Sequence, residues 1–344
     1  MQQDTIAAPP GQTPSDAMLQ LIFNFWITRS LYAAAKLGIA DVLKSGPAPI
    51  DRIAAETGTQ ARSLYRLLRA LASVDVFSEE GSGRFRNTPL SETLISDRPG
   101  TLRYFAISEL GEEHYGAWGD LLHSIRTGEI AFDKHFGAGV WEYLSRNPGR
   151  AATFNESMSR MTEAVNDAII WTYSFAGIRQ IVDIGGGLGS LMMSILKWNE
   201  TMKGILFDQP AVVAEGRKAI EKAGLSDRCS VVGGDFFESV PRGGDAYTMK
   251  WIIHDWDDDR AMQILNNCRE ARADDGKVVI IDTIIPGPNE PSPSKLIDLN
   301  MLVMTGGLER TLAEFESLFE RCGLRLTKVV TTPSPFSVLE GVKS

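Results

Sequence analysis

Residues 181–190 read IVDIGGGLGS, a short apolar run that leads into a glycine-rich turn. β-Branched residues followed by closely spaced glycines are typical of a buried strand that turns sharply into a helix. Glycine in such a turn lets the backbone approach a ligand closely, and the N-terminus of the following helix favours a negatively charged group. This stretch therefore predicts the first strand of an α/β sheet, with a ligand site at its carboxyl end.

Short runs of β-branched and aromatic residues recur after this stretch and alternate with helical segments, which is typical of βαβ units and a parallel sheet. We expect strands at 181–184, 204–207, 230–232, 246–249, 278–281, 324–330 and 336–339. The last two are joined by TTPSP at 331–335, a link too short for a helical crossover, so they must be antiparallel. The predicted fold class is α/β, a Rossmann-like seven-stranded sheet that is mostly parallel with a C-terminal antiparallel hairpin.

The N-terminal part of the chain has a different pattern. Helical periodicity runs from Ala17 to Leu43, two short helices are expected between 50 and 76, and a hairpin is expected around the turn at 79–83. This order is that of a winged helix, so we add a mostly helical, winged-helix-like N-terminal domain to the fold. The predicted domains are 1–105 and 106–344, the second made of a helical substrate-side linker at 106–178 and a Rossmann-like core at 179–344.

The composition excludes several classes of protein. Hydrophobic residues make up 43% and charged residues 23% of the 344, which is ordinary for a globular chain and unlike a disordered one. The net charge of −9 argues against a generic binder of nucleic acid or anionic membranes. No stretch approaches the roughly 18 consecutive apolar residues of a membrane helix, and the three cysteines form no metal-ligand pattern. We therefore expect a soluble, cytoplasmic protein with reduced thiols.

Acidic and aromatic residues at the ends of the next strands indicate what the glycine turn binds. Asp208 ends the second strand, where a carboxylate can accept hydrogen bonds from both hydroxyls of a ribose. Asp235 and Phe236 follow the third strand, where they can bond an adenine amino group and stack on its ring. Ser190 stands where a dinucleotide fingerprint needs glycine, which disfavours an NAD-linked dehydrogenase. The spacing instead predicts S-adenosylmethionine as the cofactor.

His254 is the candidate general base. Of the four histidines, it is the one that follows a predicted parallel strand. An imidazole with a pKa of about 6.5 suits removal of a proton from a phenol or similar hydroxyl near neutral pH. A buried structural histidine is the usual alternative, but the surrounding motifs favour catalysis. The acids at 257–259 are typical of the first turn of a helix rather than of a metal site, so we expect no metal.

The catalytic half resembles the class I S-adenosylmethionine-dependent methyltransferases. The whole chain is similar to the small-molecule O-methyltransferases of the plant caffeic acid and bacterial polyketide-tailoring type. The stretches that carry the resemblance are 183–190, FDQP at 207–210, GDFF at 234–237, 250–257 and GGLERT at 306–311. The resemblance implies that His254 is the general base and that the cofactor is held by Gly185, Gly187, Asp208, Asp235, Phe236 and Lys250.

The resemblance also implies two acidic residues behind the histidine. Glu309 fits the second of these positions. At the first, this chain has Asp282 where the plant members carry glutamate, so its carboxylate reaches one methylene less far and its role in orienting His254 is left open. Flat or adaptable apolar side chains suit an aromatic acceptor. The expected substrate-binding residues are Asn155, Met158, Trp251, Met301 and Met304.

The predicted function is methyl transfer to a hydroxyl of a small, aromatic or phenolic acceptor, with S-adenosylhomocysteine as the product of the cofactor. The family's N-terminal module is a dimerisation domain, which implies a homodimer with no nucleic-acid or membrane partner. One alternative is N-methylation or a non-methylating reaction with the same cofactor. Another is a ligand-responsive transcription regulator, because Arg62, Arg66 and Arg69 lie one helical turn apart on the candidate recognition helix. The neutral charge of the first 100 residues argues against the regulator.

Overall fold

The structure is a computed structural model that describes residues 13–81 and 83–344. The chain divides into two compact units after Glu112. Among the described residues, none of the helices combines the length and apolar character that a bilayer crossing needs.

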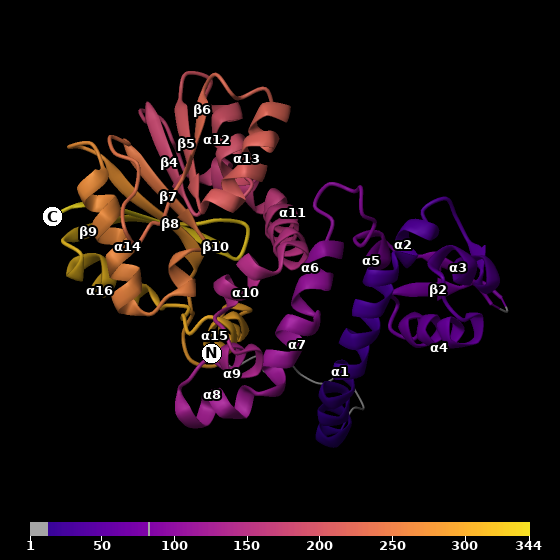
Figure 1. Cartoon of the computed structure of the whole chain (residues 1–344). Coiled ribbons are helices and arrows are strands. Elements are labelled where there is room, and N and C mark those ends of the chain that lie inside the picture. The colour runs from indigo at the N-terminus through magenta and orange to yellow at the C-terminus, as the bar shows by residue number, and fades with distance from the viewer. Residues whose placement is uncertain (1–12, 82) are drawn as a thin grey trace. The chain divides into compact units, whose positions relative to one another are not determined.

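The N-terminal unit is mostly helical and carries a small antiparallel sheet (Figure 1). Its elements are α1 (Pro14–Leu37), α2 (Ile39–Val42), β1 (Ala48–Pro49), α3 (Ile50–Thr57), α4 (Ala61–Ala72), β2 (Phe77–Glu79), β3 (Arg84–Asn87), α5 (Pro89–Glu92) and α6 (Arg103–Glu109). β3 lies between β1 and β2 and is antiparallel to both. The predicted order of helices followed by a hairpin is confirmed.

The first half of α1 exposes apolar side chains. The helix begins at a capping box between Thr13 and Asp16 and ends at Gly38, whose φ of 69° is in the left-handed region. Ala34 and Ala35 near its end are buried. Its exposed large hydrophobic residues are Met18, Leu19, Leu21, Ile22, Phe23, Phe25 and Trp26. Such a continuous apolar surface is unusual for a face that water covers.

The second unit contains the predicted seven-stranded sheet. Its strands are β4 (Gln180–Ile184), β5 (Lys203–Asp208), β6 (Cys229–Gly233), β7 (Ala246–Lys250), β8 (Lys277–Thr283), β9 (Leu324–Thr331) and β10 (Phe336–Lys343). They lie in the order β6-β5-β4-β7-β8-β10-β9. The first five are parallel, and β10 is antiparallel to both β8 and β9. The predicted fold class, including the terminal hairpin, is confirmed.

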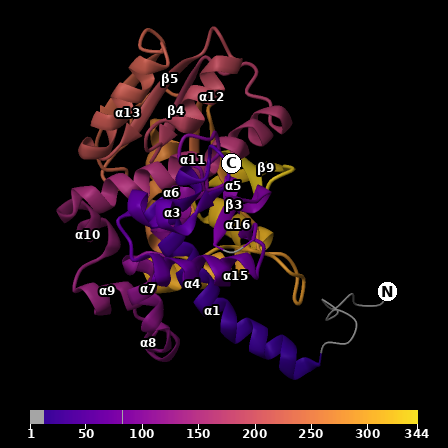
Figure 2. The same cartoon turned by 90° about the vertical axis from the view of Figure 1, so that its right-hand side faces the viewer.

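Helices cover both faces of this sheet (Figures 1 and 2). Before the sheet come α7 (Glu112–Gly119), α8 (Leu121–Thr127), α9 (Ala131–Phe136), α10 (Val140–Arg146) and α11 (Pro148–Thr172). The helices that lie between its strands along the chain are α12 (Ser190–Trp198), α13 (Pro210–Lys222), the 3₁₀ helix η1 (Ile253–Asp255), α14 (Asp258–Ala271), α15 (Ser294–Met304) and α16 (Leu312–Arg321). Neighbouring strand residues point to opposite faces, so Ile181 packs with residues of α11 and α12, while Val182 packs with residues of α14 and α16. A strand buried on both faces explains why Ile181, Val182 and Ile184 before the glycine turn are all apolar, although the buried Asp183 lies among them.

All three cysteines, Cys229, Cys268 and Cys322, are buried and free. Burial raises the pKa of Cys229 and of Cys322 to about 11, and it raises the pKa of Cys268 further. The expectation of reduced thiols agrees with this geometry.

Arg310 fixes the segment between β7 and α14. Its guanidinium is 1% exposed and donates hydrogen bonds to the backbone oxygens of Ile253 (3.2 Å), Leu308 (3.3 Å) and Trp256 (3.1 Å). It also donates to the Asp258 carboxylate at 2.9 Å, at the start of α14. One side chain thus joins the segment that carries His254 to the loop before α16.

Gly307 allows these two segments to touch. The backbone N–H of Leu308 donates to the carbonyl oxygen of His254 at 2.9 Å. A Cβ at Gly307 would lie 2.0 Å from that oxygen and 2.4 Å from the carbonyl carbon of Asp255. Because both neighbours are backbone atoms, a side chain at this position requires the segments to move apart.

Gly307→Ala should therefore lower the free energy of unfolding by about 1–3 kcal/mol. Thermal unfolding by calorimetry is the measurement. Gly149→Ala on α11 is the matched control, because a Cβ there meets nothing within 4 Å; its Tm should be unchanged or slightly higher. A Gly307→Ala protein with the native Tm would contradict the close approach.

Candidate active site

The predicted site residues gather at one edge of the sheet. Because β6, β5, β4, β7 and β8 are adjacent and parallel, their carboxyl ends lie along the same edge. The glycine turn follows β4, Asp208 ends β5, Asp235 follows β6, and Lys250 ends β7. Open α/β sheets bind their ligands at this edge.

The glycine turn forms an open cradle at the start of α12. Gly185, Gly187 and Gly189 have φ values of 64°, 58° and 82°, in the left-handed region that favours glycine. A Cβ at Gly185 would lie 2.4 Å from Ile252 Cδ1, so the turn packs closely on that side. A Cβ at Gly187 would meet nothing within 4 Å, so the other side is open to a ligand.

Asp208 lies against this cradle. Its Oδ2 accepts a hydrogen bond from Gly187 N at 2.8 Å, and its Oδ1 accepts one from Gln209 N at 2.7 Å. Burial raises the pKa of Asp208, while these two backbone hydrogen bonds oppose the rise. Each carboxylate oxygen has two acceptor positions, so Asp208 retains capacity for a ligand's hydroxyl groups.

Asp235 and Phe236 lie in a turn after β6. Asp235 Oδ1 accepts a hydrogen bond from Phe237 N at 2.8 Å, which closes an Asx-type turn rather than capping a helix. The ring of Phe236 contacts the ring of Phe237 at a centroid distance of 4.8 Å and that of Trp256 at 6.0 Å. These contacts leave a cluster of aromatic rings near the end of β6.

Lys250 is tied to a residue that the sequence analysis missed. Its Nζ donates to Asn166 Oδ1 at 2.8 Å, and Asn166 Nδ2 donates to Ser190 Oγ at 2.8 Å. Burial lowers the pKa of Lys250 to about 8, although the charge of Asp183 opposes this. Asn166 is fully buried on α11 and connects that helix to the first residue of α12. The signal in the sequence was weak: Asn166 is one polar residue in a helix that carries many, and Ser157 of the same helix is equally buried.

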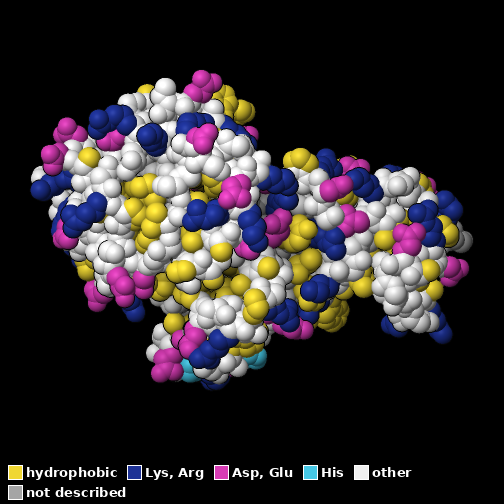
Figure 3. All heavy atoms as spheres, turned by 45° about the horizontal axis from the view of Figure 1, so that its top comes forward, with side chains coloured by type: hydrophobic (Ala, Val, Ile, Leu, Met, Phe, Trp, Pro, Cys, Tyr) yellow, Lys and Arg dark blue, Asp and Glu magenta, His cyan; other side chains and the backbone are white. Residues whose placement is uncertain are grey.

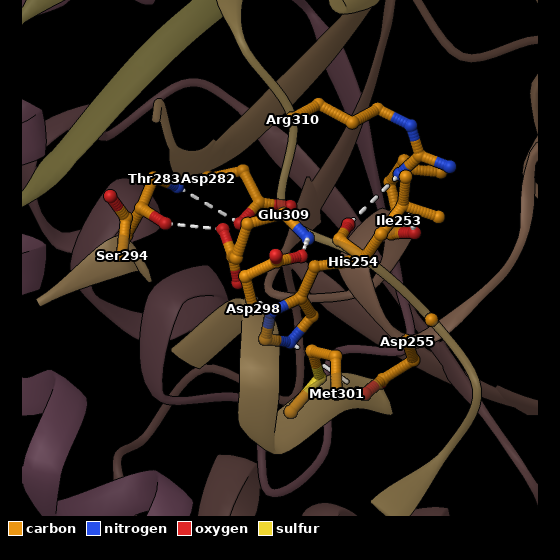
Figure 4. A network of polar contacts seen from close by, with 12 residues as sticks. Ile253, His254, Asp255, Asp282, Thr283, Ser294, Asp298, Met301, Glu309 and Arg310 are labelled. Atoms are coloured by element: carbon orange, nitrogen blue, oxygen red, sulfur yellow. Dashed lines mark hydrogen bonds and ion pairs between the residues drawn. The ribbon is translucent and has the colours of Figure 1, made fainter. Parts of the chain in front are cut away.

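His254 and Glu309 form a buried pair (Figure 4). His254 Nδ1 and Glu309 Oε1 lie 2.6 Å apart, and the two residues are 6% and 2% exposed. In the neutral imidazole, Nδ1–H donates to the carboxylate and Nε2 keeps its lone pair. The ring of Trp251 stacks on the imidazole with centroids 5.5 Å apart and 10° between the planes. Trp251 has a φ of 55°, an uncommon backbone conformation for an aromatic residue.

Two residues that the sequence analysis did not select hold Glu309. The hydroxyl of Thr283 donates to Glu309 Oε2. The backbone N–H of Glu309 donates to Asp298 Oδ1 at 3.0 Å. Thr283 comes from the end of β8 and Asp298 from α15 (Figure 4).

Asp282 lies behind the pair. Its Oδ1 accepts from Thr283 N at 2.9 Å, and its buried Oδ2 has no partner among the described residues. No hydrogen bond joins it to His254 in the described part of the chain, but its charge acts on the imidazole.

The acids around His254 determine its proton affinity. Burial by itself lowers the pKa of His254, but the charges of Asp282 and Asp255 and the hydrogen bond to Glu309 outweigh burial and raise it to about 9. Burial raises the pKa of Asp282 to about 7 and that of Asp255 to about 6. The site therefore favours a positive charge on the imidazole.

One histidine and two carboxylates come close enough to offer ligands to a cation. Atoms of His254, Asp282 and Glu309, the three residues that the resemblance places together, lie within 4.8 Å of one another. Both Glu309 oxygens already accept hydrogen bonds, from His254 and Thr283. The Glu309 carboxylate thus accepts hydrogen bonds from two groups of the protein itself.

The expected substrate-side residues come from two helices and the end of β7. Met301 and Met304 on α15 are 7% and 4% exposed, and Met301 lies beside His254 in Figure 4. Asn155 and Met158 on α11 are half-buried. Trp251 packs against Phe336 as well as His254.

Comparison with known proteins identifies the family. Residues 118–325 match a model of the O-methyltransferase domain, and residues 19–97 match a model of the O-methyltransferase dimerisation domain. The phenazine O-methyltransferase PhzM of Lysobacter antibioticus is 44% identical over 331 residues, covering 96% of this chain and 97% of that protein. The phenazine-1-carboxylate N-methyltransferase of Pseudomonas aeruginosa is 33% identical over 317 residues, covering 92% and 93%.

Solved structures agree with this result. The crystal structure of LaPhzM superimposes with a TM-score of 0.94 at 44% identity, covering 97% of this chain and 100% of that one. The O-methyltransferase NcsB1 from neocarzinostatin biosynthesis, in complex with S-adenosylmethionine and 2-hydroxy-5-methyl naphthoic acid, has a TM-score of 0.82 at 30% identity and covers 97% and 100%. The resemblance inferred from the motifs is confirmed: the chain belongs to the S-adenosylmethionine-dependent O-methyltransferases of small molecules.

Proposed function

We propose that this chain methylates a hydroxyl of a small aromatic acceptor, with His254 as the general base. The observation that carries the proposal is the buried hydrogen bond from His254 Nδ1 to Glu309 at the carboxyl end of β7. S-Adenosylmethionine supplies a methyl group that is already activated on a sulfonium. The protein's own tasks are therefore to hold the reactants in line and to accept the acceptor's proton.

The cofactor-binding residues we propose are Gly185, Gly187, Asp208, Asp235, Phe236 and Lys250. The open side of the glycine turn at Gly187 supports this set, because a ligand can approach the backbone there. Asp208 retains acceptor positions for ribose hydroxyls. Lys250 acts through Asn166 in this proposal and orients Ser190 at the start of α12.

Glu309 keeps the proton on Nδ1 of His254, so that the lone pair of Nε2 accepts the proton of the acceptor hydroxyl. With S-adenosylmethionine bound, the acceptor oxygen would bond to the methyl carbon as the sulfonium–methyl bond breaks, and S-adenosylhomocysteine would be the leaving group. The proton of the acceptor remains on Nε2 of His254. The resulting imidazolium is stabilised by Glu309 and by the nearby charges of Asp282 and Asp255. We assign Asp282 this electrostatic role.

An aromatic acceptor suits the side chains near His254. We propose Asn155, Met158, Trp251, Met301 and Met304 as substrate-binding residues, because aromatic and thioether groups pack well against flat rings. The relatives support this class of substrate, since one is named for phenazine and another was solved with a naphthoic acid.

N-Methylation is the second candidate, because one relative is named as an N-methyltransferase. An amine attacks through a lone pair that it already has, whereas a hydroxyl gains nucleophilicity when a base removes its proton. A His254–Glu309 pair positioned for proton removal therefore favours a hydroxyl acceptor. The family comparisons give no support to a transcription regulator.

We also propose that the N-terminal module, residues 1–105, forms a homodimer. The match to a dimerisation domain and the exposed apolar side chains of α1 support this pairing. On the face shown in Figure 3, Lys and Arg side chains are interspersed with Asp and Glu side chains, which gives nucleic acid or a membrane no continuous basic surface to bind. Cytoplasmic localisation stays a prediction.

With methyl-labelled S-adenosylmethionine and a panel of phenols and aromatic amines, the native protein should place label on a hydroxyl oxygen. His254→Ala should lower this turnover by about 10²–10⁴-fold, the usual contribution of a general base, without changing cofactor affinity. His123→Ala is the control, because that histidine pairs with the exposed Glu129. Label on nitrogen alone, or native turnover in His254→Ala, would contradict the proposal.

The kcat/KM of the enzyme should rise with pH, reach half of its maximum near pH 9 and level off above that pH. The base must be neutral to accept a proton, and the pKa of His254 is raised to about 9. Each pH unit below this value lowers the neutral fraction about tenfold. Rates between pH 6 and 10, with an acceptor whose own pKa lies outside this range, test the expectation; a profile that is flat from pH 6 to 9 refutes it.

Asp208→Asn should weaken binding of S-adenosylmethionine and S-adenosylhomocysteine about 10–100-fold. This range corresponds to the roughly 1.5–3 kcal/mol of a hydrogen bond to a charged group. Isothermal titration calorimetry with each compound is the measurement. The exposed Asp227, in the loop before β6, provides the control Asp227→Asn with native affinity. Equal affinity in both variants would remove Asp208 from the proposed site.

A further inference from the structure

We propose that Thr283 is a positioning residue, whose hydroxyl holds the Glu309 carboxylate toward His254. The inference rests on the proposed function, because it concerns the orientation of the proposed base. Neither the motifs nor the family resemblance singled out this residue.

The contact is buried and joins two separate parts of the fold. Thr283 is the last residue of β8 and is 2% exposed. Its hydroxyl donates to Glu309 Oε2, while His254 Nδ1 lies 2.6 Å from Oε1. Each oxygen of the carboxylate therefore has a donor from a different element, and together they set the direction in which the carboxylate faces.

Chemistry fixes the direction of this hydrogen bond. A hydroxyl can donate or accept, but an ionised carboxylate only accepts, so the Thr283 hydroxyl must donate. Threonine is branched at Cβ and has few χ1 rotamers. Its backbone is also paired with Phe336 of β10. The donor therefore comes from a stiff side chain on a strand that is held by its neighbour, which suits a group that orients another.

Among the described residues, the neighbouring acid Asp282 makes no hydrogen bond to Glu309. Its carboxylate accepts from Thr283 N through Oδ1, and Oδ2 has no partner among the described residues. The hydroxyl of the neighbouring Thr283 is the group of this strand end that reaches Glu309. Thr283 thus donates the second hydrogen bond to the Glu309 carboxylate, beside the one from His254.

The other polar groups near the pair come from several elements. Asp255 of η1 lies 3.7 Å from His254 Nε2, Asp282 lies at the end of β8, and Asp298 of α15 accepts from the backbone of Glu309. Arg310 is directed to backbone oxygens and to Asp258. The Thr283 hydroxyl is uncharged, so its removal leaves the charged groups of the site in place.

The test compares Thr283→Val, which keeps the shape and removes the hydroxyl, with Thr283→Ser, which keeps the hydroxyl. Thr283→Val should lower kcat about 10–100-fold, the usual effect of losing a hydrogen bond that orients an active-site residue. The midpoint of its kcat/KM profile should move to lower pH, because a carboxylate that is no longer held stabilises the imidazolium less. Thr283→Ser should recover most of kcat and the native midpoint.

Further measurements separate orientation from stability. The ¹⁵N chemical shifts of His254 report its pKa directly, and this pKa should fall in Thr283→Val and not in Thr283→Ser. Thr57→Val is a control, because it removes a hydrogen bond to Ile53 in the N-terminal unit; it should lower Tm without moving the pH midpoint. If Thr283→Val does not fold, Thr283→Ala replaces it, with kcat at least tenfold below that of Thr283→Ser.

Native kcat and a native pH midpoint in Thr283→Val would overturn this inference. The proposed function is judged separately by His254→Ala. An inactive His254→Ala with a native Thr283→Val rejects the role of Thr283 alone, whereas native turnover in His254→Ala rejects the general base and this inference with it.

Discussion

The geometry of the active site depends on the buried guanidinium of Arg310. The segment after β7 and the loop before α16 both turn backbone oxygens toward this guanidinium, and backbone oxygens that leave water need donors. Arg310 supplies these donors to Ile253, Trp256 and Leu308. Its charge is balanced by Asp258, which also pairs with Arg321 of α16. Through these contacts one buried side chain joins α14, α16 and the segment that carries His254.

The acidic character of the site suits the charge that the proposed reaction moves. One positive charge arrives with the sulfonium and ends on the imidazole of His254, so charge is transferred across the site and is neither created nor lost. Asp255, Asp282 and Glu309 surround the position where it ends and raise the pKa of His254. The net charge of −9, which argued against nucleic acid, is partly made of these residues.

The sequence predicted the fold well because parallel strands buried on both faces leave apolar runs, such as 278–281, and because few connections suit them. It also placed His254 and Glu309 in one site. It did not predict Thr283 or Asn166. Their contacts join residues that are 26 and 84 positions apart, and a single hydroxyl or amide creates no periodic pattern. Such contacts depend on how the helices and strands pack together, and the spacing of residues along the sequence does not predict that packing.

The buried cysteines have a practical consequence for spectroscopy. A thiol reacts with maleimides and similar probes as the thiolate, and burial raises the pKa of Cys229, Cys268 and Cys322 well above neutral. The folded protein therefore offers little background to such reagents. A cysteine introduced on an exposed helix becomes the selective attachment point for a fluorophore or spin label, without prior removal of the native thiols from the core.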